Sequence, residues 1–263
     1  MDRRGGRGTL NIMSDTVERF SNRVENYVKY RPSYPQDVID HLETAGVLSP
    51  DSLVVDVGCG TGISPRIFLE NGYRVIGVEP NAAMRDAAIR ELAPFPKFEL
   101  IDGTSTATGL PDASADVVVA AQAFHWFDPQ PTRAEFRRIL RPGGHIVLMW
   151  NERQLNTTAF LIDYEQLLLR YADDYTKVRH ENIDAASLSD FFGKEYSTAS
   201  FVNVQEFDLG GLRGRMLSSS YMPAADDPRF PELDRELSAL FAKHAESGRI
   251  KVFYDTNVYY SQV

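Results

Sequence analysis

Cysteine is almost absent from this chain of 263 residues, in which Cys59 is the only one. A single cysteine excludes an intrachain disulfide and any metal site built from several cysteine ligands. Such sparing use of cysteine fits a reducing compartment, where disulfides are rare. We therefore expect a cytoplasmic protein with no bound metal.

Long hydrophobic runs and an excess of positive charge are also missing. No apolar stretch approaches the roughly 20 residues that a transmembrane helix needs, and no leader of the secretory kind is visible. The net charge of -9 argues against a broad nucleic-acid footprint, which requires clustered lysine and arginine. The basic residues near the start are the exception, and we interpret residues 1–13 as a disordered leader. We expect neither a membrane nor a nucleic-acid partner.

Short apolar segments alternate with amphipathic helical patterns through the middle of the chain. This alternation predicts an α/β fold with a parallel, doubly wound sheet. No linker or repeat marks a second domain, so we predict one domain over 14–263 with an N-terminal helical cap at 14–47. The predicted strands are residues 53–57, 73–78, 97–101, 116–121, 145–150, 200–209 and 250–260, with a turn at 142–144. After residue 151, helices are predicted at 158–175, 184–193, 211–220 and 231–246.

The most informative segment is residues 54–62, Val-Val-Asp-Val-Gly-Cys-Gly-Thr-Gly. A buried strand that contains Asp56 runs into a glycine loop, and a helix opens near Ser64. Because glycine has no side chain, a ligand can touch the backbone amides of such a loop directly. The next strand ends in Glu79, where a ribose would present its two hydroxyls. Together these features predict a cofactor that contains adenosine.

The spacing of the loop glycines separates two kinds of cofactor. Dinucleotide loops read G-x-G-x-x-G, whereas Gly58, Gly60 and Gly62 are spaced G-x-G-x-G. Asp56 would repel a pyrophosphate but attract an ammonium group. S-adenosylmethionine carries an ammonium, a carboxylate and an adenosine, so it fits this loop best. A nicotinamide or other nucleotide site, and a tight turn without a ligand, stay open as alternatives.

With these motifs the chain resembles the class I S-adenosylmethionine-dependent methyltransferases from about Met13 onward. The glycine motif, the acidic strand end and the segment at 140–144 carry the resemblance. A closer likeness, to the small-molecule (type 11) branch that includes trans-aconitate methyltransferase-like proteins, rests on residues 30–35, 122–127, 218–221 and 254–256. The resemblance implies a Rossmann-like, mostly parallel, seven-stranded sheet whose late strands close one edge in antiparallel fashion. It also implies a helical lid, which we assign to the insertion at 151–196.

Ligands of open α/β sheets bind outside the carboxyl ends of the strands. By resemblance, Arg31 adds a contact to the cofactor's carboxylate from the N-terminal helices. Met84 is either a neighbour of the adenine or part of the helix core. Thr104 and Ser105 stand where the family often has an acidic residue for the adenine, so hydroxyl or backbone atoms would have to serve. The predicted cofactor-binding residues are Arg31, Asp56, Gly58, Cys59, Gly60, Gly62, Glu79, Pro80, Met84, Thr104, Ser105 and Gln122.

His125 is the only histidine predicted at the carboxyl end of a strand, so it is the candidate general base. A base is needed only if the acceptor keeps its proton at the working pH, because the sulfonium is already an activated leaving group. His125 could instead orient the substrate or pack among aromatic rings. Trp126 and Trp150 could favour the cationic sulfonium through their ring faces, although core packing explains them as well. Tyr221 is a third candidate contact for the acceptor.

The sequence thus predicts a single-domain methyltransferase that transfers a methyl group to an oxygen or nitrogen of a small molecule. The resemblance suggests a carboxylic acid or a specialised metabolite as the acceptor. Two alternatives remain, a nicotinamide-dependent oxidoreductase and a cofactor-binding protein of the same fold without turnover. We expect a monomer or a homodimer.

Overall fold

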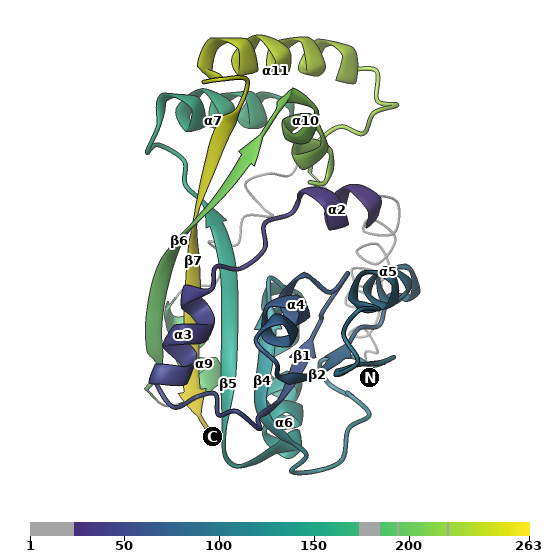
Figure 1. The fold of residues 1–263 in the computed structure, drawn as a ribbon, viewed down its shortest axis with the longest axis vertical. Helices are drawn as coiled ribbons and strands as arrows, with labels where there is room; N and C mark the ends of the chain where they lie inside the picture. The colour runs from purple at the N-terminus through teal and green to yellow at the C-terminus, as the bar shows by residue number, and fades with distance from the viewer. Residues whose placement is uncertain (1–23, 174–184, 194, 220) are drawn as a thin grey trace, which may run out of the picture.

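The computed structural model describes residues 24–173, 185–193, 195–219 and 221–263 (Figure 1). The leader predicted at 1–13 lies outside these ranges, and so does the part of the predicted N-terminal helix pair (14–47) that precedes residue 24. Within them the chain forms a sheet flanked by helices, and further helices stand above one end of its longest strands.

One mixed sheet of seven strands organises the chain, in the order β3-β2-β1-β4-β5-β7-β6. The first five strands are parallel, and β7 is antiparallel to both β5 and β6. The predicted mostly parallel, doubly wound sheet is therefore confirmed. The strands are β1 (Leu53–Val57), β2 (Arg74–Val78), β3 (Phe98–Ile101), β4 (Ala115–Ala121), β5 (Leu140–Arg153), β6 (Ser197–Phe207) and β7 (Ile250–Gln262).

Strand β5 differs from its prediction because it runs through the expected turn. Its pairing with β4 jumps from Leu140 to His145, so the residues between them bulge out of the ladder. Gly143 has a φ of 83° there, a conformation that glycine adopts without steric cost. The predicted Pro-Gly-Gly turn is thus an irregularity inside one long strand rather than the start of a new one.

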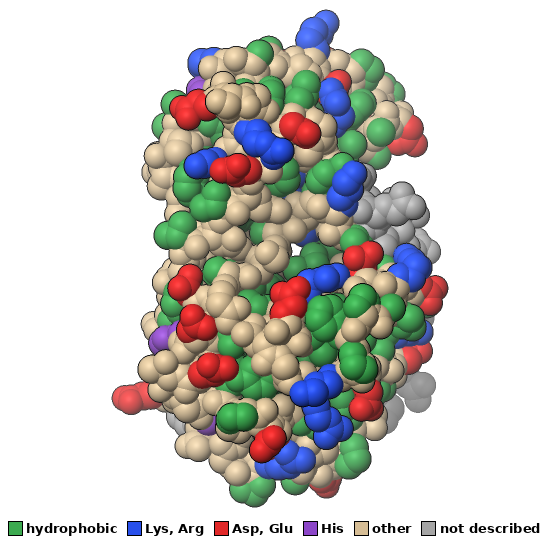
Figure 2. Space-filling view, in the orientation of Figure 1, with side chains coloured by type: hydrophobic (Ala, Val, Ile, Leu, Met, Phe, Trp, Pro, Cys, Tyr) green, Lys and Arg blue, Asp and Glu red, His purple; other side chains and the backbone are tan. Residues whose placement is uncertain are grey.

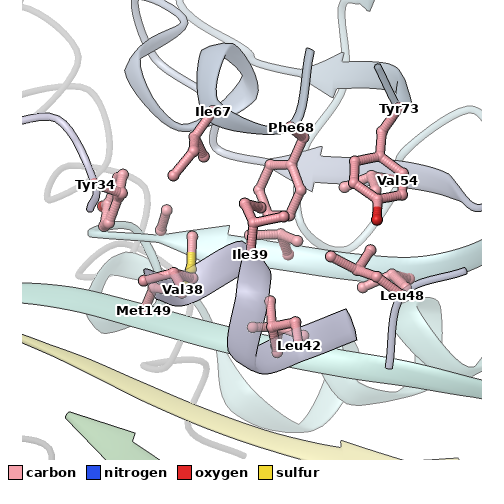
Figure 3. Close-up of a cluster of buried hydrophobic side chains, with 14 of the residues drawn as sticks. Tyr34, Val38, Ile39, Leu42, Leu48, Val54, Ile67, Phe68, Tyr73 and Met149 are labelled. Carbon is pink, nitrogen blue, oxygen red and sulfur yellow. The ribbon is translucent and has the colours of Figure 1, made fainter. Parts of the chain in front are cut away.

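Helices cover both faces of the sheet. Helices α3 (Asp37–Thr44) and α4 (Ile63–Glu70) pack on one face through residues such as Val38, Leu42 and Phe68 (Figure 3). Helices α6 (Pro129–Ile139) and α9 (Ala185–Phe192) cover the other face. Their periodic apolar residues are the ones that are buried, because each helix turns one apolar stripe to the sheet. Helix α5 (Ala82–Leu92) lies beside β3.

A separate hydrophobic cluster holds three helices together above the sheet, and we call this part the cap (Figure 1). Its helices are α7 (Ala159–Tyr171), α10 (Leu209–Leu217) and α11 (Phe230–His244). The ends of β6 and β7 extend into the same cluster. The insertion predicted at 151–196 therefore contributes α7 to the cap, whereas its α9 packs against α6 on the sheet.

Helix α2 (Val24–Tyr30) links the cap to the lower part of the molecule, because it contacts both α10 and α5. The approach to α10 is close, since a side chain placed at Gly214 would overlap the ring of Tyr30. Gln205 of β6 donates a hydrogen bond of 3.3 Å to the Tyr30 carbonyl. The segment that follows Tyr30 therefore starts at the cap and leads down to the sheet.

Candidate active site

The glycine loop after β1 has the backbone that its sequence predicts. Gly58, Gly60 and Gly62 have φ values of 74°, 56° and 90°, which side-chain-bearing residues rarely adopt. A Cβ at Gly62 would lie 2.7 Å from Leu92, and one at Gly58 would lie 2.7 Å from Ala123. A Cβ at Gly60 would meet no atom within 4 Å. Two of the glycines thus allow close packing, and Gly60 faces open space.

Asp56 stands in β1 just before this loop and is 0% exposed. Its Oδ2 accepts a hydrogen bond of 2.5 Å from the Ser64 hydroxyl of α4, whereas its Oδ1 is buried with no partner among the described residues. Burial raises the pKa of Asp56 to about 7; the Ser64 hydrogen bond opposes this, and the negative charge of Glu79 adds to it. A buried carboxylate oxygen without a partner is costly unless a cation or a donor reaches it.

Glu79 directly follows β2 and faces the same loop. Its Oε2 accepts the Gly60 amide at 3.0 Å, and its Oε1 accepts the Asn81 amide at 2.9 Å. Burial raises the pKa of Glu79, against the effect of these two amides. Each carboxylate oxygen has a further lone pair. Glu79 therefore fixes the glycine loop and can still accept two hydroxyl groups.

Arg85 of α5 holds the turn after Glu79 through hydrogen bonds to its backbone. Its Nη1 donates to the Glu79 carbonyl at 2.9 Å, to the Pro80 carbonyl at 2.8 Å and to Asp102 at 3.0 Å. Asp102, which follows β3, is thereby engaged with an arginine. The predicted cofactor residue Pro80 thus lies in a turn whose backbone is held in place.

Two predicted cofactor residues have side chains that belong to the core. The Cys59 thiol is buried and lies against β2, since a Cβ at Gly77 would come within 2.7 Å of its sulfur. Burial also raises the pKa of this thiol. Met84 is buried with Ala87 and packs against Val28 of α2. The Cys59 side chain therefore faces the core, and the Met84 side chain packs between α5 and α2.

Thr104 and Ser105 form a tight turn after β3. The Ser105 hydroxyl is buried and accepts a hydrogen bond of 2.9 Å from Thr132 of α6. The Thr104 amide donates to the Ala107 carbonyl at 3.0 Å, and its side chain is exposed. Ser105 thus has a structural partner, whereas the Thr104 hydroxyl lies near only that of Thr106, at 3.3 Å.

Arg31 follows α2 and lies between the cap and the sheet. Its guanidinium stacks 4.9 Å from the Tyr27 ring centroid, and its Nη2 donates to the Ser218 carbonyl at 2.9 Å. Its Nε is buried with no partner among the described residues. Burial lowers the pKa of Arg31, and the neighbouring charge of Arg215 lowers it further. Burial raises the pKa of Tyr34, three residues after Arg31, and the charges of Tyr27 and Asp56 raise it further, so this segment lies near Asp56.

Gln122 directly follows β4 and has a φ of 54°, which is unusual for a residue with a side chain. Its Nε2 donates to the Asn151 carbonyl at 2.9 Å, and its Oε1 is buried without a partner in the described parts of the chain. Asn151 in turn donates to the Ser33 carbonyl at 3.1 Å. Gln122 is thus joined through β5 to the segment that carries Arg31.

The residues predicted for catalysis and for the acceptor have different surroundings. His125 is half-buried in a short 3-10 helix, η1 (Phe124–Trp126), with its ring 4.7 Å from that of Trp126, which is 37% exposed. Trp150 is 2% exposed and packs edge-on against Phe124 at 6.3 Å. Tyr221 is half-buried at the edge of the cap cluster. Trp150 thus packs in the core, with a buried Nε1 that has no partner among the described residues, whereas His125 is half-buried and Trp126 is exposed.

Several residues near these groups are not predicted by the sequence analysis. Ser64 and Tyr34 flank Asp56, Asn151 ties the elements together, and Arg215 of α10 lies beside Arg31. Arg215 has a sequence signal, since it shares the buried side of its helix with Leu212 and Met216. Figure 2 shows the surface hollowed between the cap and the sheet-bearing part. Among the described residues no group of three or more His, Cys, Asp or Glu side chains could hold a metal ion.

The comparisons with known proteins agree with this geometry. Residues 55–148 match a family described as a methyltransferase domain, and they contain the glycine loop, Glu79 and His125. Over 159 residues this chain is 31% identical to an uncharacterised methyltransferase-like protein of Schizosaccharomyces pombe, covering 60% of each chain. It is 39% identical over 134 residues to an uncharacterised methyltransferase of Mycobacterium tuberculosis, covering 51% of this chain and 52% of the relative.

The chain thus spans only about half to three fifths of the length of these relatives. Solved structures extend the likeness of fold to most of the chain. A proposed type II methyltransferase from Anaeromyxobacter dehalogenans has a TM-score of 0.67 and 22% identity, covering 89% of this chain and 98% of that one. Phosphoethanolamine N-methyltransferase 2 of Haemonchus contortus, in complex with phosphomonomethylethanolamine and S-adenosylhomocysteine, has a TM-score of 0.51 and 13% identity, covering 95% and 58%. The predicted Rossmann-like methyltransferase fold is confirmed.

Proposed function

We propose that this protein is an S-adenosylmethionine-dependent methyltransferase that acts on an oxygen or nitrogen of a small molecule. One observation carries the proposal. Asp56 presents an unpartnered buried oxygen beside the glycine loop, and Glu79 is held against Gly60 of that loop. A ligand with an ammonium group near one carboxylate and a ribose near the other would satisfy both.

Different residues of this chain would bind different groups of the cofactor. Asp56 would receive the ammonium, the open backbone at Gly60 would allow close approach, and Glu79 would accept from the ribose hydroxyls. Arg31 would bind the carboxylate, for which a planar guanidinium is well suited. The adenine would lie toward Met84 and Thr104. The cofactor itself supplies an activated methyl group, so these residues contribute chiefly by positioning.

Two features argue against the nicotinamide alternative. The carboxylate of Asp56, whose Oδ1 has no partner among the described residues, would lie beside a pyrophosphate and repel it. The family match over residues 55–148 also favours methyl transfer. The small-molecule class, a cytoplasmic location and a monomeric or homodimeric state are proposed with it, on the basis of sequence features alone.

His125 is the proposed catalytic residue, either as the base that takes the acceptor's proton or as a group that orients the acceptor. Its accessible place beside Trp126 fits both roles. His125→Ala is expected to leave the affinity for S-adenosylhomocysteine unchanged and to lower kcat. A general base further predicts a loss of about 100-fold or more together with a changed pH profile. Unchanged kcat would remove His125 from the reaction.

Calorimetry with S-adenosylhomocysteine tests the proposed function most directly. We expect the protein to bind it and not NAD. Glu79→Gln should weaken binding by about 1–3 kcal/mol, since hydrogen bonds to a charged acceptor are lost. Glu99→Gln is a matched control, because Glu99 is an exposed glutamate of the neighbouring strand β3. Absence of binding, or equal affinity in Glu79→Gln, would contradict the proposal.

A further inference from the structure

The cap contains a buried arginine whose hydrogen-bond partners, among the described residues, are all neutral. Arg215 of α10 is 9% exposed. Its Nε donates to the Tyr254 hydroxyl at 3.2 Å, and its Nη1 donates to the hydroxyls of Ser219 at 3.1 Å and Ser218 at 3.4 Å. Hydroxyl groups orient a guanidinium, but they do not neutralise its charge.

A second cation lies next to it. Arg31 donates to the backbone carbonyl of Ser218, the residue whose hydroxyl also accepts from Arg215. The charge of Arg215 contributes to the lowered pKa of Arg31, as expected for neighbouring groups of like sign. Among the described residues, no carboxylate forms an ion pair with either guanidinium.

The other arginines of the cap show that this arrangement is not general. Arg213, two residues before Arg215, pairs with Asp234 of α11. Arg153, at the end of β5, pairs with Glu165 of α7. Asp234 and Glu165 are therefore paired with arginines other than Arg31 and Arg215. Two desolvated cations without an anion are unfavourable, so the arrangement calls for an anionic ligand.

The cofactor has one carboxylate, which would pair with only one of the two guanidiniums. Arg31 stacks on Tyr27 and lies three residues before Tyr34, whose charged neighbours include Asp56 beside the glycine loop. Arg215 is instead fixed to β7 through Tyr254, whose own hydroxyl donates to Gln205 at 2.9 Å. Its position is thus set by the cap and not by the loop.

We propose that Arg215, with the hydroxyls of Ser218 and Ser219, binds an anionic group of the methyl acceptor. The group is a carboxylate or a phosphate, since both match the planar fork of a guanidinium. This inference rests on the proposed function. The acceptor would then span the hollow between the cap and the sheet, with its anionic end at Arg215 and its reacting atom toward His125.

The first experiment separates the acceptor from the cofactor. Arg215→Gln should bind S-adenosylhomocysteine with the affinity of the unaltered protein, whereas Arg31→Gln should bind it more weakly. Arg213→Gln is the control for changes on the same helix. If Arg215→Gln loses S-adenosylhomocysteine affinity as Arg31→Gln does, Arg215 serves the cofactor and the inference is wrong. The proposed function would stand in that case.

The second experiment measures release of S-adenosylhomocysteine with a panel of small carboxylic acids and organic phosphates, each beside its neutral amide or alcohol. We expect turnover of anionic members only, and the panel shows which anion is preferred. With the best acceptor, Arg215→Gln should raise KM by about 10- to 100-fold, as expected for a lost charge-assisted hydrogen bond. Arg215→Lys should restore part of that loss, and thermal melting checks that each variant folds. Turnover restricted to neutral compounds, no turnover of any anion, or an unchanged KM would overturn the inference.

Discussion

The two sides of the site hold buried charges of opposite sign. On the sheet side, burial raises the pKa values of Asp56 and Glu79. On the cap side, Arg31 and Arg215 have no carboxylate partner in the described parts of the chain. The structure does not pair the two sets with each other, although ion pairs would relieve both. The difference indicates where ligand groups belong, with cationic and hydroxyl groups at the sheet and anionic groups at the cap.

Glu135 of α6 shows what a buried carboxylate looks like when it serves only the fold. It is 8% exposed, the same fraction as Glu79. Arg138 donates to both of its oxygens at 2.8 Å, and these bonds are the main reason that its pKa is lowered to about 2. Arg85 instead bonds the backbone carbonyl of Glu79 and leaves its carboxylate to two amides. The same exposed fraction thus accompanies opposite pKa shifts, because burial is the largest cause at Glu79 and the Arg138 hydrogen bonds are the largest cause at Glu135.

The largest expected effect comes from removing the charge of Asp56. Between the unfolded pKa of about 4 and the folded value near 7, the folded protein keeps a proton that the unfolded chain has lost. The free energy of unfolding therefore falls as the pH rises through this range, and it stays low above it. Asp56→Asn should make the unliganded protein about 2–4 kcal/mol more stable at pH 8. Urea unfolding at pH 6 and pH 8 measures this.

The same variant should bind S-adenosylhomocysteine more weakly, because the ammonium loses its carboxylate. Gain of stability with loss of affinity is the pattern of a residue kept for binding. Asn at this position can still accept from Ser64, so the fold keeps that hydrogen bond. If Asp56→Asn is less stable than the unaltered protein at pH 8, the carboxylate serves the fold as Glu135 does, and the comparison between the two sides fails.

The next effect separates two glycines of the loop. Gly62→Ala combines a φ of 90° with a contact of 2.7 Å to Leu92, so it should lower the free energy of unfolding by about 2–4 kcal/mol. Gly60→Ala has a φ of 56° and open space, so its cost to stability should be about 1–2 kcal/mol. Its methyl group would instead intrude where the cofactor approaches. Urea unfolding and calorimetry with S-adenosylhomocysteine should therefore rank the two variants in opposite orders.

The sheet side could be predicted from sequence because its determinants are local. An apolar strand, glycines at fixed spacing and an acid at the next strand end specify a backbone that needs few distant contacts. Asp56, Gly60 and Glu79 are accordingly found together. Trp150 and Met84 show the limit of this reasoning, since their burial depends on neighbours such as Phe124 and Val28 that come from other elements.

The cap side could not be predicted in the same way. Helix α7 packs with α10 and α11, whereas α9 of the same insertion packs on the sheet, and amphipathic patterns do not say which partner a helix chooses. In the sequence Arg215 looks like an ordinary helical arginine. Its hydrogen bond to Tyr254, 39 positions away, is visible only in the folded structure. A long-range contact of this kind leaves only the weak signal of a charged residue on an apolar helix face.

The smallest expected effect concerns strain at the sheet edge. Among the described residues, Ala113, Gln122 and Ser247 are the non-glycine residues with positive φ, and only Gln122 stands at the carboxyl end of a strand. Gln122→Gly and Gln122→Ala both lose the hydrogen bond to Asn151, but only glycine relieves the backbone. Gln122→Gly should therefore be about 1 kcal/mol more stable than Gln122→Ala in urea unfolding. Equal stabilities of the two variants would mean that the backbone at Gln122 stores no strain. The buried charges alone would then distinguish the sheet side of the site from the cap side.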